Sequence, residues 1–115
     1  MKTGFGWIKI GDVTYEHDVV IHTDTSVTKR LKKRSRELKE RYGHTPLSEN
    51  ELDLLREENH DVVYIGTGQY GSLPLTPGAK ELLQNYPTII LPTPDLVLKI
   101  GQEKKKYLAI IHVTC

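Results

Sequence analysis

Two prolines that follow a glycine motif limit how this chain can fold. The segment 64–72, YIGTGQYGS, contains the pattern G-x-G-x-x-G directly after an apolar run. That pattern holds the pyrophosphate of a dinucleotide when a helix begins inside it, because the amides at the helix N-terminus contact the phosphates. Here the helix would contain Pro74, which removes a helical hydrogen bond and clashes with the preceding turn at a cost of about 3 kcal/mol. We therefore expect the helix to begin at Thr76, followed by Pro77, and the glycines to lie in a loop.

A dinucleotide site also needs an acidic residue that binds the ribose, and this sequence has no such residue in the usual structural context. Asp95 has a suitable separation from the glycines, but it follows Pro94 in the first turn of an expected helix, where a carboxylate favours the helix dipole. We therefore expect no dinucleotide and no other cofactor. We interpret the glycines as a tight exit from a buried strand.

Helix and strand signals alternate from residue 48 onward. Ser48 and Glu51 form a capping-box pattern, and two Thr-Pro pairs mark further helix starts. The expected elements are a helix in 45–59, a strand in 61–65, a helix in 76–86, a strand in 88–91, a helix in 93–101 and a strand in 106–115. This order predicts an α/β fold with a mixed, mostly parallel central sheet flanked by helices, and the apolar last strand is expected at its centre.

The N-terminal part of the chain has a different pattern. FGWIKI (5–10) and VTYEHDVVIHTD (13–24) are rich in β-branched and aromatic residues, and the turn dipeptide Gly11-Asp12 separates them. They predict a β-meander of two or three strands that either extends the main sheet or forms a side layer. We expect the 115 residues to form a single domain, 1–115.

The cysteine and histidine residues exclude several kinds of site. The single Cys115 excludes an intramolecular disulfide and a cysteine-based zinc site. The histidines at 17, 22, 44 and 60 have no metal-ligand spacing, so we expect no metal. The sequence has no secretory signal and no apolar stretch of the ~20 residues that span a membrane, so we expect a cytoplasmic protein without membrane contact.

Residues 29–41, KRLKKRSRELKER, form a concentrated basic segment in a chain whose formal net charge is +1. Leu31, Leu38 and Tyr42 have helical spacing, which predicts a surface helix. The segment is either a solvated helix face or a docking patch for an acidic protein partner, and nucleic acid is disfavoured because no aromatic residues are interleaved. The candidate partner-binding residues are Lys32, Lys33, Arg34 and Arg36.

Two loops are expected at the carboxyl ends of neighbouring parallel strands, where open α/β sheets bind ligands. These are the glycine loop and Pro92–Pro94, which both lead to helix N-termini. Free amides there suit a carboxylate, a phosphate or a peptide backbone. The candidate ligand-binding residues are Gly66, Thr67, Gly68, Gln69, Tyr70 and Thr93.

His112 and Cys115 are not expected to form a catalytic pair, because residues three apart on a strand point to opposite faces. We interpret His112 as a core histidine whose ring nitrogens are satisfied. The sequence contains no other known catalytic motif, so we assign no catalytic residue.

The motifs GTGQYG, LPTPD and HVTC (112–115) resemble the Mth nine-three-eight domain family, which is named after a methanogen protein. SVTKRLKKRSRELKERYG, LSENELDLL and VVYIGTG fit the same pattern in the same order, so the resemblance covers essentially the whole chain. It implies a layered α/β fold around a mixed central sheet, and it supplies no catalytic residue. Eukaryotic members include an adipogenesis-associated protein and a mitochondrial complex I assembly factor, which implies binding to other proteins.

The sequence therefore favours a non-enzymatic binding or assembly module. Two alternatives stay open. One is a protein that binds a small anionic ligand, as a carrier or an enzyme, in the crevice at the strand ends. The other is a weak nucleic-acid binder that uses residues 29–41.

Overall fold

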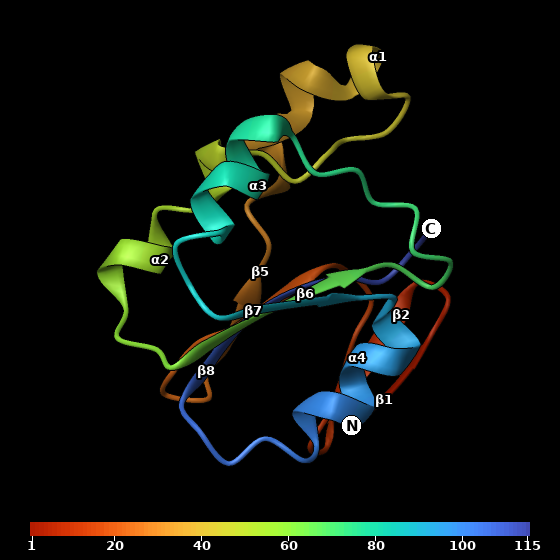
Figure 1. The fold of residues 1–115 in the computed structure, drawn as a ribbon. Helices are drawn as coiled ribbons and strands as arrows, with labels where there is room; N and C mark the ends of the chain where they lie inside the picture. The colour runs from red at the N-terminus through yellow and green to blue at the C-terminus, as the bar shows by residue number, and fades with distance from the viewer.

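Five strands form the central sheet, in the order β5-β4-β8-β6-β7 (Figure 1). The computed structural model describes residues 1–115. The strands are β4 (Val19–Ile21), β5 (Val27–Lys29), β6 (Val62–Thr67), β7 (Thr88–Leu91) and β8 (Tyr107–His112). β6 pairs in parallel with β7 and β8, whereas β4 pairs in antiparallel with β5 and β8. The predicted α/β class and mixed sheet are confirmed, with the last strand at the centre as expected. The sheet is not mostly parallel, because two of its four strand pairings are antiparallel.

The central strands β6 and β8 are apolar because both of their faces are covered. Alternate residues of β6 point to opposite sides, so Tyr64 packs into one core cluster and Ile65 into the other. Ile110 and Ile111 of β8 are divided between the two clusters in the same way. Strands buried on both faces read as continuous apolar runs, which is the pattern the sequence shows.

The N-terminal meander forms a separate layer. β1 (Lys2–Gly4), β2 (Trp7–Ile10) and β3 (Val13–Tyr15) make a three-stranded antiparallel sheet. This sheet and α4 (Thr93–Ile100) lie together on one side of the central sheet (Figure 1), where Ile8 and Leu96 belong to the same core cluster. Both arrangements that the sequence allowed occur. β1, β2 and β3 form the side layer, whereas β4, which lies in the predicted stretch 13–24, extends the central sheet beside β8.

Short helices lie on the other side of the sheet. α2 (Leu54–Glu57) and α3 (Pro77–Leu83) pack against it, and η1 (Lys32–Leu38), α1 (Lys39–Tyr42) and η2 (Glu49–Glu51) complete this layer, with no buried residue in α1. α3 begins where the Thr-Pro pair predicts, since Thr76 caps it by accepting from the amide of Ala79. No helical residue lies between Thr67 and Thr76, so the glycine motif is in a loop as expected.

Three helix predictions are corrected. The expected helix in 45–59 is two short pieces, η2 and α2, because the carboxylate of Glu51 binds a buried arginine and does not complete a capping box. The surface helix predicted for the basic segment forms, but it begins after Leu31 and turns mainly as a 3₁₀-helix, with Ser35 as its buried residue. Thr93 is the first residue of α4, and Pro92 occupies the cap position.

None of the helices has both the length and the apolar composition needed to cross a lipid bilayer.

Candidate functional site

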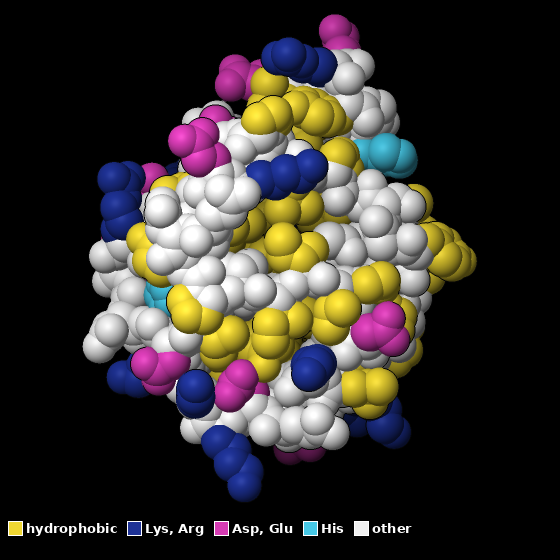
Figure 2. Space-filling model, in the orientation of Figure 1, with side chains coloured by type: hydrophobic (Ala, Val, Ile, Leu, Met, Phe, Trp, Pro, Cys, Tyr) yellow, Lys and Arg dark blue, Asp and Glu magenta, His cyan; other side chains and the backbone are white.

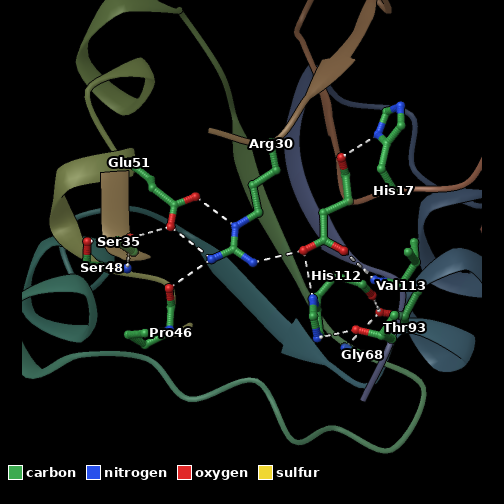
Figure 3. Close-up of polar contacts among 12 residues, drawn as sticks. His17, Arg30, Ser35, Pro46, Ser48, Glu51, Gly68, Thr93, His112 and Val113 are labelled. Atoms are coloured by element: carbon green, nitrogen blue, oxygen red, sulfur yellow. Dashed lines mark hydrogen bonds and ion pairs between the residues drawn. The ribbon is translucent and has the colours of Figure 1, made fainter. Parts of the chain in front are cut away.

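Arg30 is the centre of a buried charge cluster at the end of β5 (Figure 3). Its side chain is 1% exposed, and its guanidinium lies between two carboxylates. Nε and Nη2 donate to Glu51 at 2.7 and 2.9 Å, and Nη1 donates to Asp18 at 2.9 Å. Nη2 also donates to the carbonyl oxygen of Pro46 at 2.8 Å. Burial lowers the pKa of Arg30, but the two carboxylates outweigh burial and raise that pKa above its usual value.

Asp18 joins this cluster to the end of β8. One carboxylate oxygen accepts from the Val113 amide at 2.9 Å, and the other contacts His112 Nδ1 at 2.7 Å as well as Arg30. Burial raises the pKa of Asp18, but these hydrogen bonds and charges outweigh it and lower the pKa to about 2. Asp18 is therefore a carboxylate at neutral pH.

Two serine hydroxyls complete the shell around Glu51. Ser35 of η1 donates to the Glu51 carboxylate, and Ser35 and Ser48 lie 2.6 Å apart between their hydroxyl oxygens (Figure 3). The amide of Ser48 donates to Ser35 at 3.3 Å. The cluster thus ties η1 to η2, which explains why Ser35 is the buried residue of the basic segment.

The ring of His112 has a partner on each nitrogen. Nδ1 contacts Asp18, and Nε2 lies 3.1 Å from the hydroxyl oxygen of Thr114. Thr93 approaches from α4, where its hydroxyl donates to the His112 carbonyl at 2.6 Å and accepts from the Gly68 amide at 3.0 Å (Figure 3). This geometry agrees with a core histidine whose ring is satisfied.

The glycine loop binds the last residues of this chain. The amide of Gln69 donates to the Thr114 carbonyl at 2.6 Å, and the amides of Tyr70 and Ser72 donate to the Cys115 oxygen at 3.2 and 3.0 Å. These are the groups that a phosphate would need. The loop therefore holds peptide backbone, and its amides are already engaged.

The candidate crevice residues are brought together, but they contact each other and their own chain. Gly66, Thr67 and Gly68 are buried at the end of β6, next to Thr93. A Cβ on Gly66 would lie 2.9 Å from the Thr93 hydroxyl, so this glycine allows α4 to approach the sheet.

The side chains of Gln69 and Tyr70 lie next to the N-terminal meander. The Gln69 side chain donates to the Thr3 hydroxyl at 3.0 Å, which joins the loop to the meander. Tyr70 is 74% exposed and its ring lies 6.1 Å from that of Phe5.

A pocket of about 570 Å³ opens beside the buried cluster, and we call it the basic pocket. Its cationic lining residues are Lys29, Arg30, Lys32, Lys33 and Arg36, and its other lining residues include His17, Asp18 and Thr114. Arg30 forms ion pairs. The three lysines of the lining and Arg36 form none. The pocket therefore presents four unpaired cations and one unpaired carboxylate, that of Glu16.

Three of the four candidate partner-binding residues, Lys32, Lys33 and Arg36, line this pocket. Arg34 does not, and its guanidinium pairs with Asp53 at 3.5 Å. Asp18, Arg30 and Thr114 were not predicted from the sequence. No local signal identifies the cluster, since it depends on contacts between residues up to 95 positions apart.

A second groove, of about 430 Å³, lies beside β7 and is mainly apolar. Figure 2 shows apolar side chains gathered across the middle of one face, and the groove is lined by Leu75, Leu83, Tyr86 and Ile90. Lys80 is its single charged lining residue, so it lacks the charge cluster of the basic pocket.

The comparisons with known proteins identify relatives of the whole chain. The chain is 35% identical to the conserved hypothetical protein PH1505 from Pyrococcus horikoshii OT3, with a TM-score of 0.86 over 100% of this chain and 98% of that one. It is 30% identical to MT938, with a TM-score of 0.81 over 100% of this chain and 96% of that one. No family model and no curated protein matches. The chain belongs to the same family as these two proteins and shares their fold.

Gly68→Ala tests the contact between the glycine loop and the last residues. A Cβ at Gly68, whose φ is +99°, would lie 2.3 Å from the Cys115 carbonyl carbon. We expect a loss of ~3 kcal/mol or more in the free energy of unfolding, from backbone strain and overpacking together. Gly6→Ala is the control, since Gly6 has a φ of +86° and open space around it, and it should lose ~1 kcal/mol. Urea unfolding measures both, and equal losses would contradict the role of this contact.

Acid should weaken the fold through Asp18. The folded pKa of about 2 lies below the usual aspartate pKa of 3.8, so the carboxylate stabilises the fold above about pH 4 and this stabilisation is lost as the pH falls towards 2. This difference in pKa corresponds to about 2 kcal/mol in the free energy of unfolding, and urea unfolding at several pH values measures it. Asp18→Asn should lack this part of the pH dependence. Asp12→Asn, at an exposed turn, should keep it, and an unchanged dependence in Asp18→Asn would refute the assignment.

Proposed function

We propose that this protein is a binding module that holds an acidic segment of a partner protein in the basic pocket. The observation that carries the proposal is the set of four cations, on β5 and η1, that line one pocket without forming ion pairs. Like charges that face one cavity repel each other, and an acidic segment would relieve this repulsion.

The buried cluster supports the proposal because it holds the walls of the pocket in position. Arg30 connects β5 to η2 through Glu51, and Ser35 connects η1 to the same carboxylate. The cationic side chains therefore project from a backbone that is fixed before the partner arrives, which reduces the ordering cost of binding.

An acidic peptide fits the lining better than a nucleic acid does. The pocket includes Leu31, which is 43% exposed, and Val113, so apolar side chains stand next to the cations. It contains no Phe, Tyr or Trp on which a base would stack. The crevice at the strand ends is a poorer candidate, because the amides of Gln69, Tyr70 and Ser72 donate to the chain itself.

We also propose that the family shared with MT938 is the Mth nine-three-eight domain family, since the sequence motifs and the 30% identity both support it. We propose that residues 1–115 form one domain and that the protein is cytoplasmic, where the thiol of Cys115 would stay reduced.

Charge reversal on the rim tests the docking function. The probe is a fluorescent hexaglutamate peptide, and its dissociation constant is measured by anisotropy at low and high salt. Lys32→Glu/Lys33→Glu should weaken binding ~10-fold or more, because two attractive contacts become repulsive. Added salt should weaken the wild-type complex, since it screens exposed charges.

The matched control is Lys104→Glu/Lys105→Glu, which reverses two exposed lysines in the loop after α4, away from the pocket. It has the same change in net charge and should have a small effect. Equal weakening by the two double variants would reject the pocket as the docking site. Tighter binding of a single-stranded oligonucleotide than of hexaglutamate, with the same dependence on Lys32 and Lys33, would reject the acidic peptide as the ligand.

A further inference from the structure

Thr114, His112 and Asp18 lie in the order of a nucleophile, a base and an orienting carboxylate. Thr114 lies just beyond the end of β8, and its hydroxyl oxygen lies 3.1 Å from Nε2 of His112. Asp18 contacts Nδ1 at 2.7 Å on the other side of the ring. Thr114 and Asp18 both line the basic pocket.

We infer that Thr114 is an acyl-accepting nucleophile and that the basic pocket hydrolyses esters whose acyl group carries a negative charge. This activity goes beyond the proposed docking function, which needs no chemistry. It uses the same cations for a different purpose, because they would hold the charged end of the substrate and face the oxyanion that forms.

The direction of the hydrogen bonds follows from the chemistry of the groups. The Asp18 carboxylate has no proton to donate, so Nδ1 of His112 carries the proton of that contact. In the neutral ring Nε2 is then an acceptor, and the Thr114 hydroxyl donates to it. A hydroxyl in this arrangement is ready to lose its proton to the histidine.

The charge of the buried cluster favours this proton transfer. Asp18 and Glu51 contribute two negative charges and Arg30 contributes one positive charge, so the cluster has a net charge of −1 when His112 is neutral. Protonation of His112 brings the total to zero. The imidazolium that forms during the reaction is therefore stabilised by the cluster.

The reaction balances with water as the second reactant. The Thr114 oxygen bonds to the acyl carbon while its proton moves to Nε2, and the alkoxide leaving group takes that proton and departs as an alcohol. Water then attacks the Thr114 ester and gives a proton to Nε2. The Thr114 oxygen leaves with this proton, and a carboxylic acid is released.

A second histidine provides an internal comparison. His22 contacts Glu58 through Nδ1 at 2.6 Å and Thr28 through Nε2 at 2.6 Å, so the order of groups is the same. These residues line a different pocket, of about 390 Å³, in which the carboxylates of Glu51, Asp53, Glu57 and Glu58 outnumber the cations Lys29, Arg30 and Arg34. An anionic ester is not favoured there, so Thr28 supplies the matched control.

The test substrate is the mono-p-nitrophenyl ester of succinic acid, whose acyl group carries a carboxylate. Wild-type protein should release p-nitrophenolate with saturation kinetics, and Thr114→Ala should reduce kcat/KM ~100-fold or more. Thr114→Ser should retain activity because it keeps the hydroxyl, and Thr28→Ala should match the wild type. Intact-mass analysis should detect one succinyl group on the wild type and none on Thr114→Ala.

Several results would overturn the inference. These are no release above the buffer rate, an unchanged rate in Thr114→Ala, or an equal loss in Thr28→Ala. Thr114→Ala should lose hydrolysis but still bind hexaglutamate. This result would separate the inferred activity from the docking function. If Lys32→Glu/Lys33→Glu did not weaken the binding of hexaglutamate, the docking function would be rejected and the inferred hydrolysis would not.

The positioning role of Asp18 has a spectroscopic test. Long-range ¹H–¹⁵N correlation of the imidazole rings reports which nitrogen carries the proton. In the wild type His112 should be protonated at Nδ1, and Asp18→Asn should lose this preference. A wild-type ring protonated at Nε2 leaves Thr114 without a base and overturns the inference.

Discussion

The ion pairs of Arg30 with Asp18 and Glu51 are the interactions on which the arrangement of this protein depends. A buried guanidinium with one partner missing would be strongly destabilising, by about 3–5 kcal/mol in comparable cases, because an uncompensated charge would remain in the interior. The two carboxylates come from segments on either side of Arg30 in the sequence, 12 and 21 residues away. The requirement to pair both therefore fixes β4, β5 and η2 relative to each other, and Asp18 extends the constraint to β8 through Val113.

The sequence predicts those parts of the fold that depend on local chemistry. The Thr76–Pro77 start of α3 and the central place of β8 need only a cap, a proline and an apolar run, and both were predicted. The capping box of Ser48 and Glu51 has equally good local chemistry, but only half of it forms: Ser48 caps η2 by accepting from the Asn50 amide at 3.2 Å, whereas Glu51 does not reach back to Ser48. Its failure has a physical reason: a carboxylate gains more from a buried guanidinium than from one backbone amide, and the sequence alone does not reveal that Arg30 lies beside it.

The candidate site was predicted in part for the same reason. Lys32, Lys33 and Arg36 were identified because charge density is visible in the sequence, and they do line a pocket. The crevice residues were identified from the position of the glycines, and they do lie together at the strand ends. What occupies that crevice was not predictable, since the groups that fill it belong to Thr114 and Cys115, more than 40 positions from the loop. The glycine motif is thus explained by a close approach of backbone to backbone, for which Gly68 leaves space.

The position of the buried cluster beside the basic pocket connects binding with reactivity. The pocket has four unpaired cations at its rim, and the cluster beneath it has a net charge of −1 around His112. The cations and the Thr114 hydroxyl line the same pocket, so an anionic ester held by Lys32, Lys33 or Arg36 would lie beside that hydroxyl. The charge that attracts an acidic peptide would therefore also select the substrates of the inferred reaction.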